Sequence, residues 1–127
     1  MNRLLNIGVA HKIGTYSDGV EAPASARWVF TAGTPGLMPD GTYAKGITAQ
    51  AEQAWKNVLA ILAQAGMGAG DLVKVTHYLV RQEDIKEYVA VRARYLGDAR
   101  PASMLLVVPG LVRPEILVEI EAYAAKG

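Results

Sequence analysis

The sequence contains no cysteine and only two histidines, His11 and His77. The absence of cysteine excludes disulfides, thiolate metal sites and cysteine nucleophiles. The two histidines lie far apart in the sequence, with no acidic residues at ligand spacing, so we expect no metal site. The sequence also lacks the HExxH, P-loop, GxGxxG and GxSxG motifs. It therefore predicts neither a metal nor a cofactor.

An excess of charge of one sign is absent too. The chain has 13 basic and 12 acidic residues, a formal net charge of +1, and a single phenylalanine. Neither a basic patch nor a row of stacking aromatic side chains for nucleic acid is therefore indicated. No apolar run approaches the roughly 20 residues of a membrane span, and that of MNRLLNIGVAHK is too short and broken for a signal peptide. We expect a cytoplasmic protein with neither nucleic acid nor membrane as a partner.

The sequence does contain enough apolar residues for one hydrophobic core. Of its 127 residues 51% are hydrophobic, and no linker or repeat divides them, so we predict a single domain over residues 1–127. From Thr48, apolar residues recur at intervals of three and four, which predicts a helix with Thr48 as N-cap and Gly66 as its stop. A second helical pattern begins at Ile85 and ends before Gly97.

Segments rich in β-branched or alternating apolar residues predict the strands. These segments are 16–20, 26–33, 71–80, 103–108 and 116–124, with a loop at 34–43 that turns at Asp40-Gly41. The order β-β-α-β-α-β-β predicts an α+β fold in which two helices cover one face of a mixed sheet.

The second face of this sheet needs another cover. Residues 103–108 (SMLLVV) are nearly all apolar, which indicates a strand buried on both faces. Each Å² of apolar surface left in water costs about 25 cal/mol, so exposure of several such side chains is unfavourable. We expect another copy of the chain to cover this face. The alternatives are that the strand is short, or that the loop at 34–47 folds over it.

One pair of acidic residues lies on a predicted strand. Glu119 and Glu121 alternate with Val118, Ile120 and Ala122, so the two carboxylates share one face and the apolar side chains share the other. In one interpretation a carboxylate activates a water or handles a proton. In the other, both face solvent or pair with basic side chains.

Four other polar residues lie on or next to the predicted elements, and each is considered for a structural and for a functional role. His77 has the parity of its apolar neighbours, which favours a core or interface histidine over a catalytic one. Ser103 shows no nearby base in the sequence. Arg92 falls on the apolar stripe of the second helix, where it either extends to the edge or reaches an acid across an interface. Arg100 precedes Pro101, where it either binds a carboxylate or lies at the surface.

Five stretches of sequence are informative through their order and spacing. They are IGTYSDGV (13–20), WVFTAGTPGLMPDG (28–41), QAWKNVLAILAQAGMGAGDLVKVTHYLV (53–80), RPASMLLVV and LVEIEAYA. Together they resemble the RidA/YjgF family, the reactive-intermediate deaminases. The resemblance implies a chorismate-mutase-like α+β fold assembled as a homotrimer, with clefts between subunits. It also implies that Glu119 places a water that hydrolyses an enamine or imine to a keto acid and ammonia, with Tyr16 at the same cleft.

Three positions depart from the pattern of this family. Ser103 stands where deaminating members carry the arginine that holds the substrate carboxylate, Val89 where an asparagine is expected, and Thr34 where a glutamine is expected. Loss of a charged hydrogen bond weakens binding by about 1.5–3 kcal/mol. Arg92 or Arg100 could supply the cation instead, although Arg100 would face the other side of a continuous strand from Ser103.

Two functions are compatible with these residues. The first is an imine or enamine deaminase-like hydrolase of altered specificity; its catalytic residue would be Glu119, and its binding residues Tyr16, Thr34, Ser103, Arg100 and Arg92. The second is a non-catalytic trimer that binds a small, carboxylate-bearing molecule in the same clefts. The missing arginine argues against activity on 2-aminoacrylate. A ribonuclease activity, which older names of the family suggest, is not expected at a net charge of +1.

Overall fold

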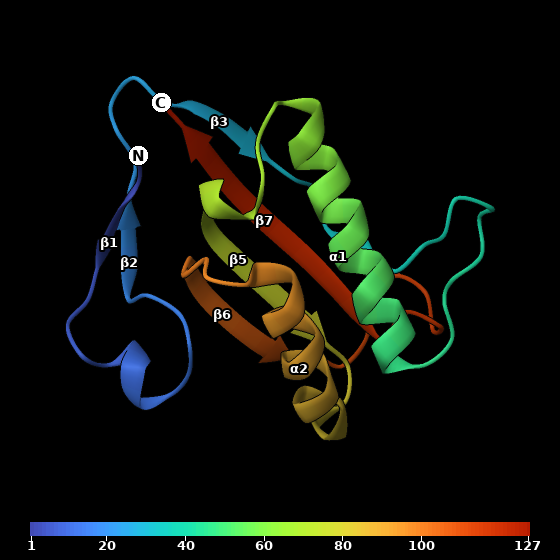
Figure 1. Ribbon diagram of the computed structural model, residues 1–127. Helices are drawn as coiled ribbons and strands as arrows, with labels where there is room; N and C mark the ends of the chain where they lie inside the picture. The colour runs from blue at the N-terminus through green and yellow to red at the C-terminus, as the bar shows by residue number, and fades with distance from the viewer.

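The computed structural model describes residues 1–127 as one sheet backed by two helices, with a small strand pair near the N-terminus (Figure 1). The elements are β1 (Arg3–Leu5), β2 (Gly19–Glu21), β3 (Arg27–Phe30), β4 (Thr34–Pro35), α1 (Ile47–Gln64), β5 (Leu72–Leu79), α2 (Ile85–Leu96), β6 (Ala102–Val107) and β7 (Val118–Lys126), with 3-10 turns at Ala10–Lys12, Ala69–Asp71 and Gln82–Asp84. The main sheet has the order β3-β7-β5-β6, and β4 also pairs with β7. Only β5 and β6 are parallel.

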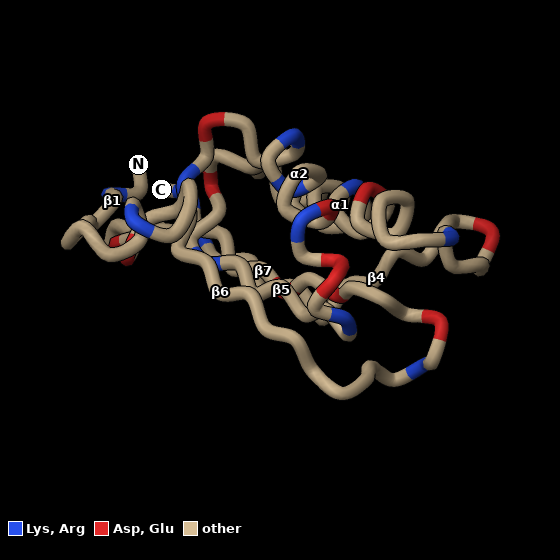
Figure 2. The backbone as a smooth tube through the Cα atoms, turned by 90° about the horizontal axis from the view of Figure 1, so that it is seen from below, with Lys and Arg blue, Asp and Glu red and all other residues tan.

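Both helices lie on the same side of the sheet (Figures 1 and 2). The predicted α+β arrangement of two helices on one face of a mixed sheet is therefore confirmed. A parallel pair needs a crossover connection, and α2 provides it between β5 and β6. The core between helices and sheet contains Trp55, Leu62, Val75, Tyr88 and Ile120 among its fully buried side chains.

Glycines set the ends of the two helices. The chain enters α1 through Gly46, whose φ of 84° lies in the region that glycine tolerates best. The prediction of Thr48 as N-cap is therefore wrong; its hydroxyl donates instead to Glu87 at 3.2 Å. The predicted stops at Gly66 and Gly97 are confirmed, with φ values of 71° and 55°.

The predicted strand at 16–20 begins later than expected. β2 starts only at Gly19, and it pairs with β1, which the sequence did not predict, in a separate two-stranded sheet. The loop before β2 is attached to the main sheet, because the N–H of Ser17 donates to the carbonyl of Pro101 at 3.2 Å. This contact places Tyr16 beside the start of β6.

The predicted strand at 26–33 ends early, at Phe30, and the short strand β4 begins at Thr34 inside the predicted loop. The hydroxyl of Thr31 accepts a hydrogen bond from the N–H of Ala122 at 2.9 Å, and its own N–H donates to the Ala122 carbonyl at 2.9 Å. A side chain thus replaces a backbone partner, and the ladder resumes only at the short strand β4. The break leaves Gly33 against the side chain of Glu119.

The face of the sheet away from the helices carries exposed apolar side chains. Phe30 is 67% exposed and contacts the rings of Trp28 (46%) and Tyr123 (37%). On β6, Met104 is 50% exposed. The single chain covers β6 on its helix side only, so burial of 103–108 on both faces stays a prediction that depends on another copy of the chain.

The loop at 34–47 does not supply the missing cover. Asn57 of α1 donates to the carbonyls of Pro35 at 3.0 Å and Leu37 at 2.9 Å, which attaches the loop to α1. In Figure 1 this loop extends from the edge of the molecule opposite β6. The apolar face is therefore available to a partner.

Candidate functional site

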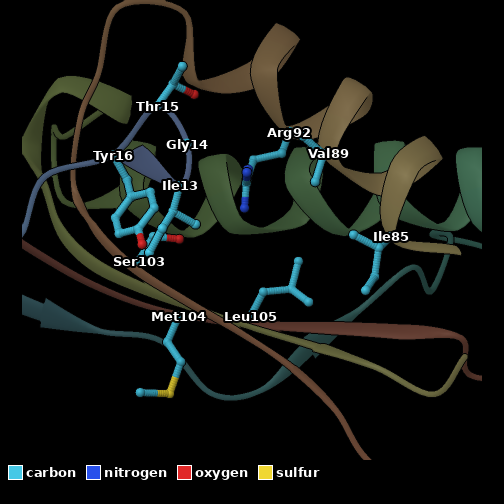
Figure 3. A pocket seen from close by; sticks show the side chains of 10 residues that line it. All are labelled: Ile13, Gly14, Thr15, Tyr16, Ile85, Val89, Arg92, Ser103, Met104 and Leu105. Atoms are coloured by element: carbon cyan, nitrogen blue, oxygen red, sulfur yellow. The ribbon is translucent and has the colours of Figure 1, made fainter. Parts of the chain in front are cut away.

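A pocket of about 570 Å³ opens at the β6 edge of the sheet, on the side of the helices (Figure 3). It lies between the N-terminal loop, α2 and β6, and its volume is in the range of small-molecule sites. Its wall is mainly apolar and consists of Ile13, Gly14, Thr15, Tyr16, Ile85, Val89, Arg92, Ser103, Met104 and Leu105. The pocket thus combines a hydrophobic wall with a few polar groups.

Arg92 extends from α2 into this pocket (Figure 3). It follows Ile85 and Val89 at intervals of four and three residues, so the three side chains share one face of the helix. None of the three ion pairs of the chain involves Arg92. A partly buried guanidinium with free donors is suited to bind a carboxylate of a ligand.

Ser103 lines the same pocket and is connected to the core by hydrogen bonds. Its Oγ lies 3.0 Å from Nε2 of His77, and Nδ1 of His77 is hydrogen-bonded to the hydroxyl of Tyr88. His77 and Tyr88 are fully buried, which confirms the prediction of a core histidine. No pattern in the sequence indicates this contact, because the parallel pairing of β5 and β6 brings His77 beside Ser103 from 26 residues away in sequence.

Lowering the pH from 7 to 5 is expected to destabilise the fold by about 2 kcal/mol through His77. Burial, and secondarily the charge of Arg92, lowers the pKa of His77 from its ordinary value of 6.5 to about 3 in the folded chain. Between these two values the unfolded chain binds more protons than the folded one. The stabilisation is therefore complete above pH 6.5 and is lost as the pH falls toward 3.

Urea denaturation at both pH values measures this loss. The matched control replaces both partners, His77→Val with Tyr88→Phe, so that no group titrates there and neither polar atom is left unpaired. Burial raises the pKa of Glu119, which acts in the opposite direction because the folded state then binds a proton more readily. Both chains should therefore carry Glu119→Gln. An equal loss of stability in the control would contradict the role of His77.

Tyr16 stands between two cavities. It lines the pocket of Arg92 and also a smaller cavity of about 330 Å³ that Arg100 lines. The guanidinium of Arg100 donates to the carbonyls of Gly97 at 2.8 Å and Ala99 at 2.9 Å, at the end of α2. Arg100 therefore lies outside the pocket that contains Arg92.

Glu119 lies on the other face of the sheet. Its neighbours Val118 and Ile120 are in the core, so Glu119 and Glu121 share the face away from the helices, as predicted. The carboxylate of Glu119 rests against Gly33, where burial raises its pKa. A carboxylate in such surroundings is a better proton acceptor than one in water.

Thr34 is close to Glu119 in the sheet but has its hydroxyl turned inward. Its Oγ1 donates to the carbonyl of Ala32 at 2.9 Å, and the residue is buried. Thr34 therefore has no free donor to offer a ligand in the single chain.

Four of the six predicted site residues thus form two groups on opposite faces of one sheet. Tyr16, Arg92 and Ser103 surround the pocket on the helix side of β6. Glu119 lies on the far face of β7, and β5 separates the two strands. One chain cannot present both groups to the same small ligand.

The functional groups of the candidate residues are a guanidinium, hydroxyls and carboxylates. No group of three or more His, Asp or Glu side chains is arranged to hold a metal ion. Neither α1 nor α2 is long and apolar enough to cross a membrane.

A mixed sheet with two helices on one face and an arginine-containing pocket at its edge defines an α+β protein with a cavity the size of small-molecule sites. The profile of the family Endoribonuclease L-PSP matches residues 9–126, and the chain belongs to this family, the RidA/YjgF family. It is 37% identical over 116 residues to a RutC family protein of Pyrococcus horikoshii, which covers 90% of this chain and 89% of that protein.

Two other proteins are similar to this chain over most of its length. The 2-iminobutanoate/2-iminopropanoate deaminase of Salmonella typhimurium is 32% identical over 121 residues, covering 90% of this chain and 89% of that protein. The crystal structure of Escherichia coli TdcF with bound serine matches with a TM-score of 0.76 at 26% identity, covering 98% of this chain and 94% of that chain.

Proposed function

We propose that the protein hydrolyses imines or enamines of small carboxylate-bearing molecules, at sites formed between copies of the chain in a homotrimer. One observation carries the proposal: the unpaired guanidinium of Arg92 shares a small-molecule pocket with the hydroxyls of Tyr16 and Ser103. These groups supply a cation and two hydroxyl donors for a carboxylate.

The homotrimer is supported by the exposed apolar face. Trp28, Phe30, Tyr123 and Met104 are already about half buried in the single chain, so covering each of them completely stabilises an assembly by about 1 kcal/mol. A closed arrangement of identical chains buries the same face of every copy. It also explains the two groups of candidate residues, since the pocket of one chain can meet Glu119 of the next.

In the proposed reaction, water hydrolyses a carbon–nitrogen double bond. The oxygen of water adds to the imine carbon while Glu119 accepts a proton from it. That proton passes to nitrogen and leaves a carbinolamine. The proton of its new hydroxyl group then moves to nitrogen as the C–N bond breaks and the C=O bond forms, so ammonia leaves and a 2-keto acid remains. The raised pKa of Glu119 suits this role, because a general base is most effective when its pKa lies close to the pH of the solution.

The wall of the pocket favours a substrate with an apolar side chain. Ile13, Ile85, Val89 and Leu105 surround the polar groups. Val89 stands at the position of a polar residue in the family pattern, and Ser103 at the position of the carboxylate-binding arginine. In the proposed site that cation is supplied by Arg92 on α2 instead of by a residue of β6. The relative named as an imine deaminase and the relative with bound serine support both the reaction type and a carboxylate-bearing ligand.

A direct assay tests the proposal. An amino-acid oxidase generates 2-iminobutanoate or 2-iminopropanoate in situ, and the loss of imine is compared with its rate in buffer. We expect acceleration for both compounds and a larger one for 2-iminobutanoate, because its longer side chain contacts the apolar wall. Binding of 2-oxobutanoate without any acceleration would contradict catalysis and favour a non-catalytic binding trimer.

A further inference from the structure

Three side chains from three elements form a hydrogen-bonded line that ends in the pocket. Tyr88 of α2 bonds to Nδ1 of His77 on β5, and Nε2 of His77 lies 3.0 Å from Oγ of Ser103 on β6. Tyr88 and His77 have no exposed surface, whereas Ser103 reaches the pocket. The hydrolytic steps described above make no use of Tyr88 or His77.

The direction of this line follows from the groups around Tyr88. A buried hydroxyl proton needs an acceptor. The Tyr88 hydroxyl has one hydrogen-bond partner, Nδ1 of His77, and the indole N–H of Trp55 and the guanidinium of Arg92 also act on it. Trp55 and Arg92 can only donate, so Tyr88 must donate to Nδ1 of His77.

The tautomer of His77 is fixed by this donation. A ring that accepts at Nδ1 and is neutral carries its proton on Nε2. Nε2 therefore donates to Oγ of Ser103 and occupies a lone pair of that oxygen. The Ser103 side chain makes no other hydrogen bond in the chain, so its own proton is free to point into the pocket.

We propose that His77 is a positioning residue that turns Ser103 into an obligatory hydrogen-bond donor for a ligand carboxylate beside Arg92. Figure 3 shows the geometry on the pocket side, with the hydroxyl of Ser103 and the guanidinium of Arg92 directed to the same space. The carboxylate part of this inference rests on the proposed function, whereas the tautomer of His77 does not.

The same line excludes a nucleophilic role for Ser103. A serine becomes a nucleophile when a histidine nitrogen takes its proton, and that nitrogen must be unprotonated. In the Tyr88–His77–Ser103 line the nitrogen facing Ser103 already carries the proton. Ser103 thus binds the ligand and does not attack it.

The first test is a long-range proton–nitrogen NMR experiment on nitrogen-15-labelled protein without ligand. A His11→Gln variant leaves His77 as the only histidine and assigns its ring. At pH 7 we expect Nε2 to be protonated and Nδ1 to behave as an acceptor. In Tyr88→Phe this preference should weaken, because nothing donates to Nδ1. A proton on Nδ1 in the unaltered chain would overturn the proposal.

The second test separates positioning from general structural support. The dissociation constant of 2-oxobutanoate is measured for the unaltered chain, Tyr88→Phe, Ser103→Ala and the double variant. Ser103→Ala should weaken binding by about tenfold to a hundredfold, the effect of one hydrogen bond to a charged group. Tyr88→Phe should weaken binding in the chain that has Ser103 and have no further effect in the chain that lacks it.

The outcomes of the two tests are distinct. An equal effect of Tyr88→Phe with and without Ser103 would overturn the proposal, because it would show a role of Tyr88 independent of that serine. Failure of the unaltered chain to bind 2-oxobutanoate would contradict the proposed function and the carboxylate part of the inference. In that case the NMR experiment still decides the direction of the hydrogen-bonded line.

Discussion

Replacing Glu119 with glutamine is expected to lower kcat for imine hydrolysis by about 10²–10⁴-fold, the usual contribution of a general base. The amide keeps the size of the side chain but cannot accept a proton from water. The carboxylate lies on the face away from the helices, where burial raises its pKa. The KM for 2-iminobutanoate should change little, because Arg92 and Ser103 hold the substrate carboxylate in the proposed site.

Two further variants test whether the position of the Glu119 carboxylate matters. A Cβ added at Gly33 would collide with the carboxylate of Glu119, the movable end of a flexible side chain. Gly33→Ala should therefore displace the carboxylate and cause much of the same loss in kcat while the fold persists. Glu121→Gln is the matched control, because Glu121 shares the strand and the face but not the contact with Gly33. An equal loss in Glu121→Gln would contradict a specific role for Glu119.

Local patterns were sufficient to predict the helices and the faces of the last strand. Apolar spacing and glycine stops located α1 and α2, because a helix that packs on a sheet needs one apolar stripe. Strict alternation placed Glu119 and Glu121 on the face opposite the core, because successive side chains of a strand point to opposite faces of the sheet. In each case the information lies within a few residues of sequence.

Features that depend on contacts distant in sequence were not predicted. The bond between His77 and Ser103 requires β5 and β6 to be parallel neighbours in one particular register, which no alternation pattern specifies. The interruption at Thr31 arises because its hydroxyl bonds to a strand near the other end of the chain. For Arg92 the helix face was clear from spacing, but what that face meets depends on where the N-terminal loop attaches.

Replacing Arg92 with methionine is expected to weaken binding of 2-oxobutanoate roughly tenfold to a hundredfold, as for loss of a charged hydrogen bond. Methionine keeps most of the apolar stem, so the pocket wall should persist. Arg94→Met is the matched control, because Arg94 lies on the same helix but is paired with Glu52 at 2.5 Å and does not line the pocket. Calorimetric titration measures both. Comparable weakening in Arg94→Met would contradict a role for Arg92 as the carboxylate-binding cation.

Mixing two defective chains tests whether the site lies between subunits. At substrate concentrations well below KM, Arg92→Met and Glu119→Gln should each retain at most about a tenth of the activity of the unaltered protein. When trimers form at random from equal amounts of the two variants, about a quarter of the subunit interfaces join an intact Arg92 from one chain to an intact Glu119 from the next. Activity should then reappear at about a quarter of the level of the unaltered protein. If both residues served one site within a chain, every site would keep a defect and mixing would restore nothing. Persistent inactivity in trimers shown by mass spectrometry to contain both chains would therefore contradict a shared site, and a monomer in solution would contradict the assembly itself.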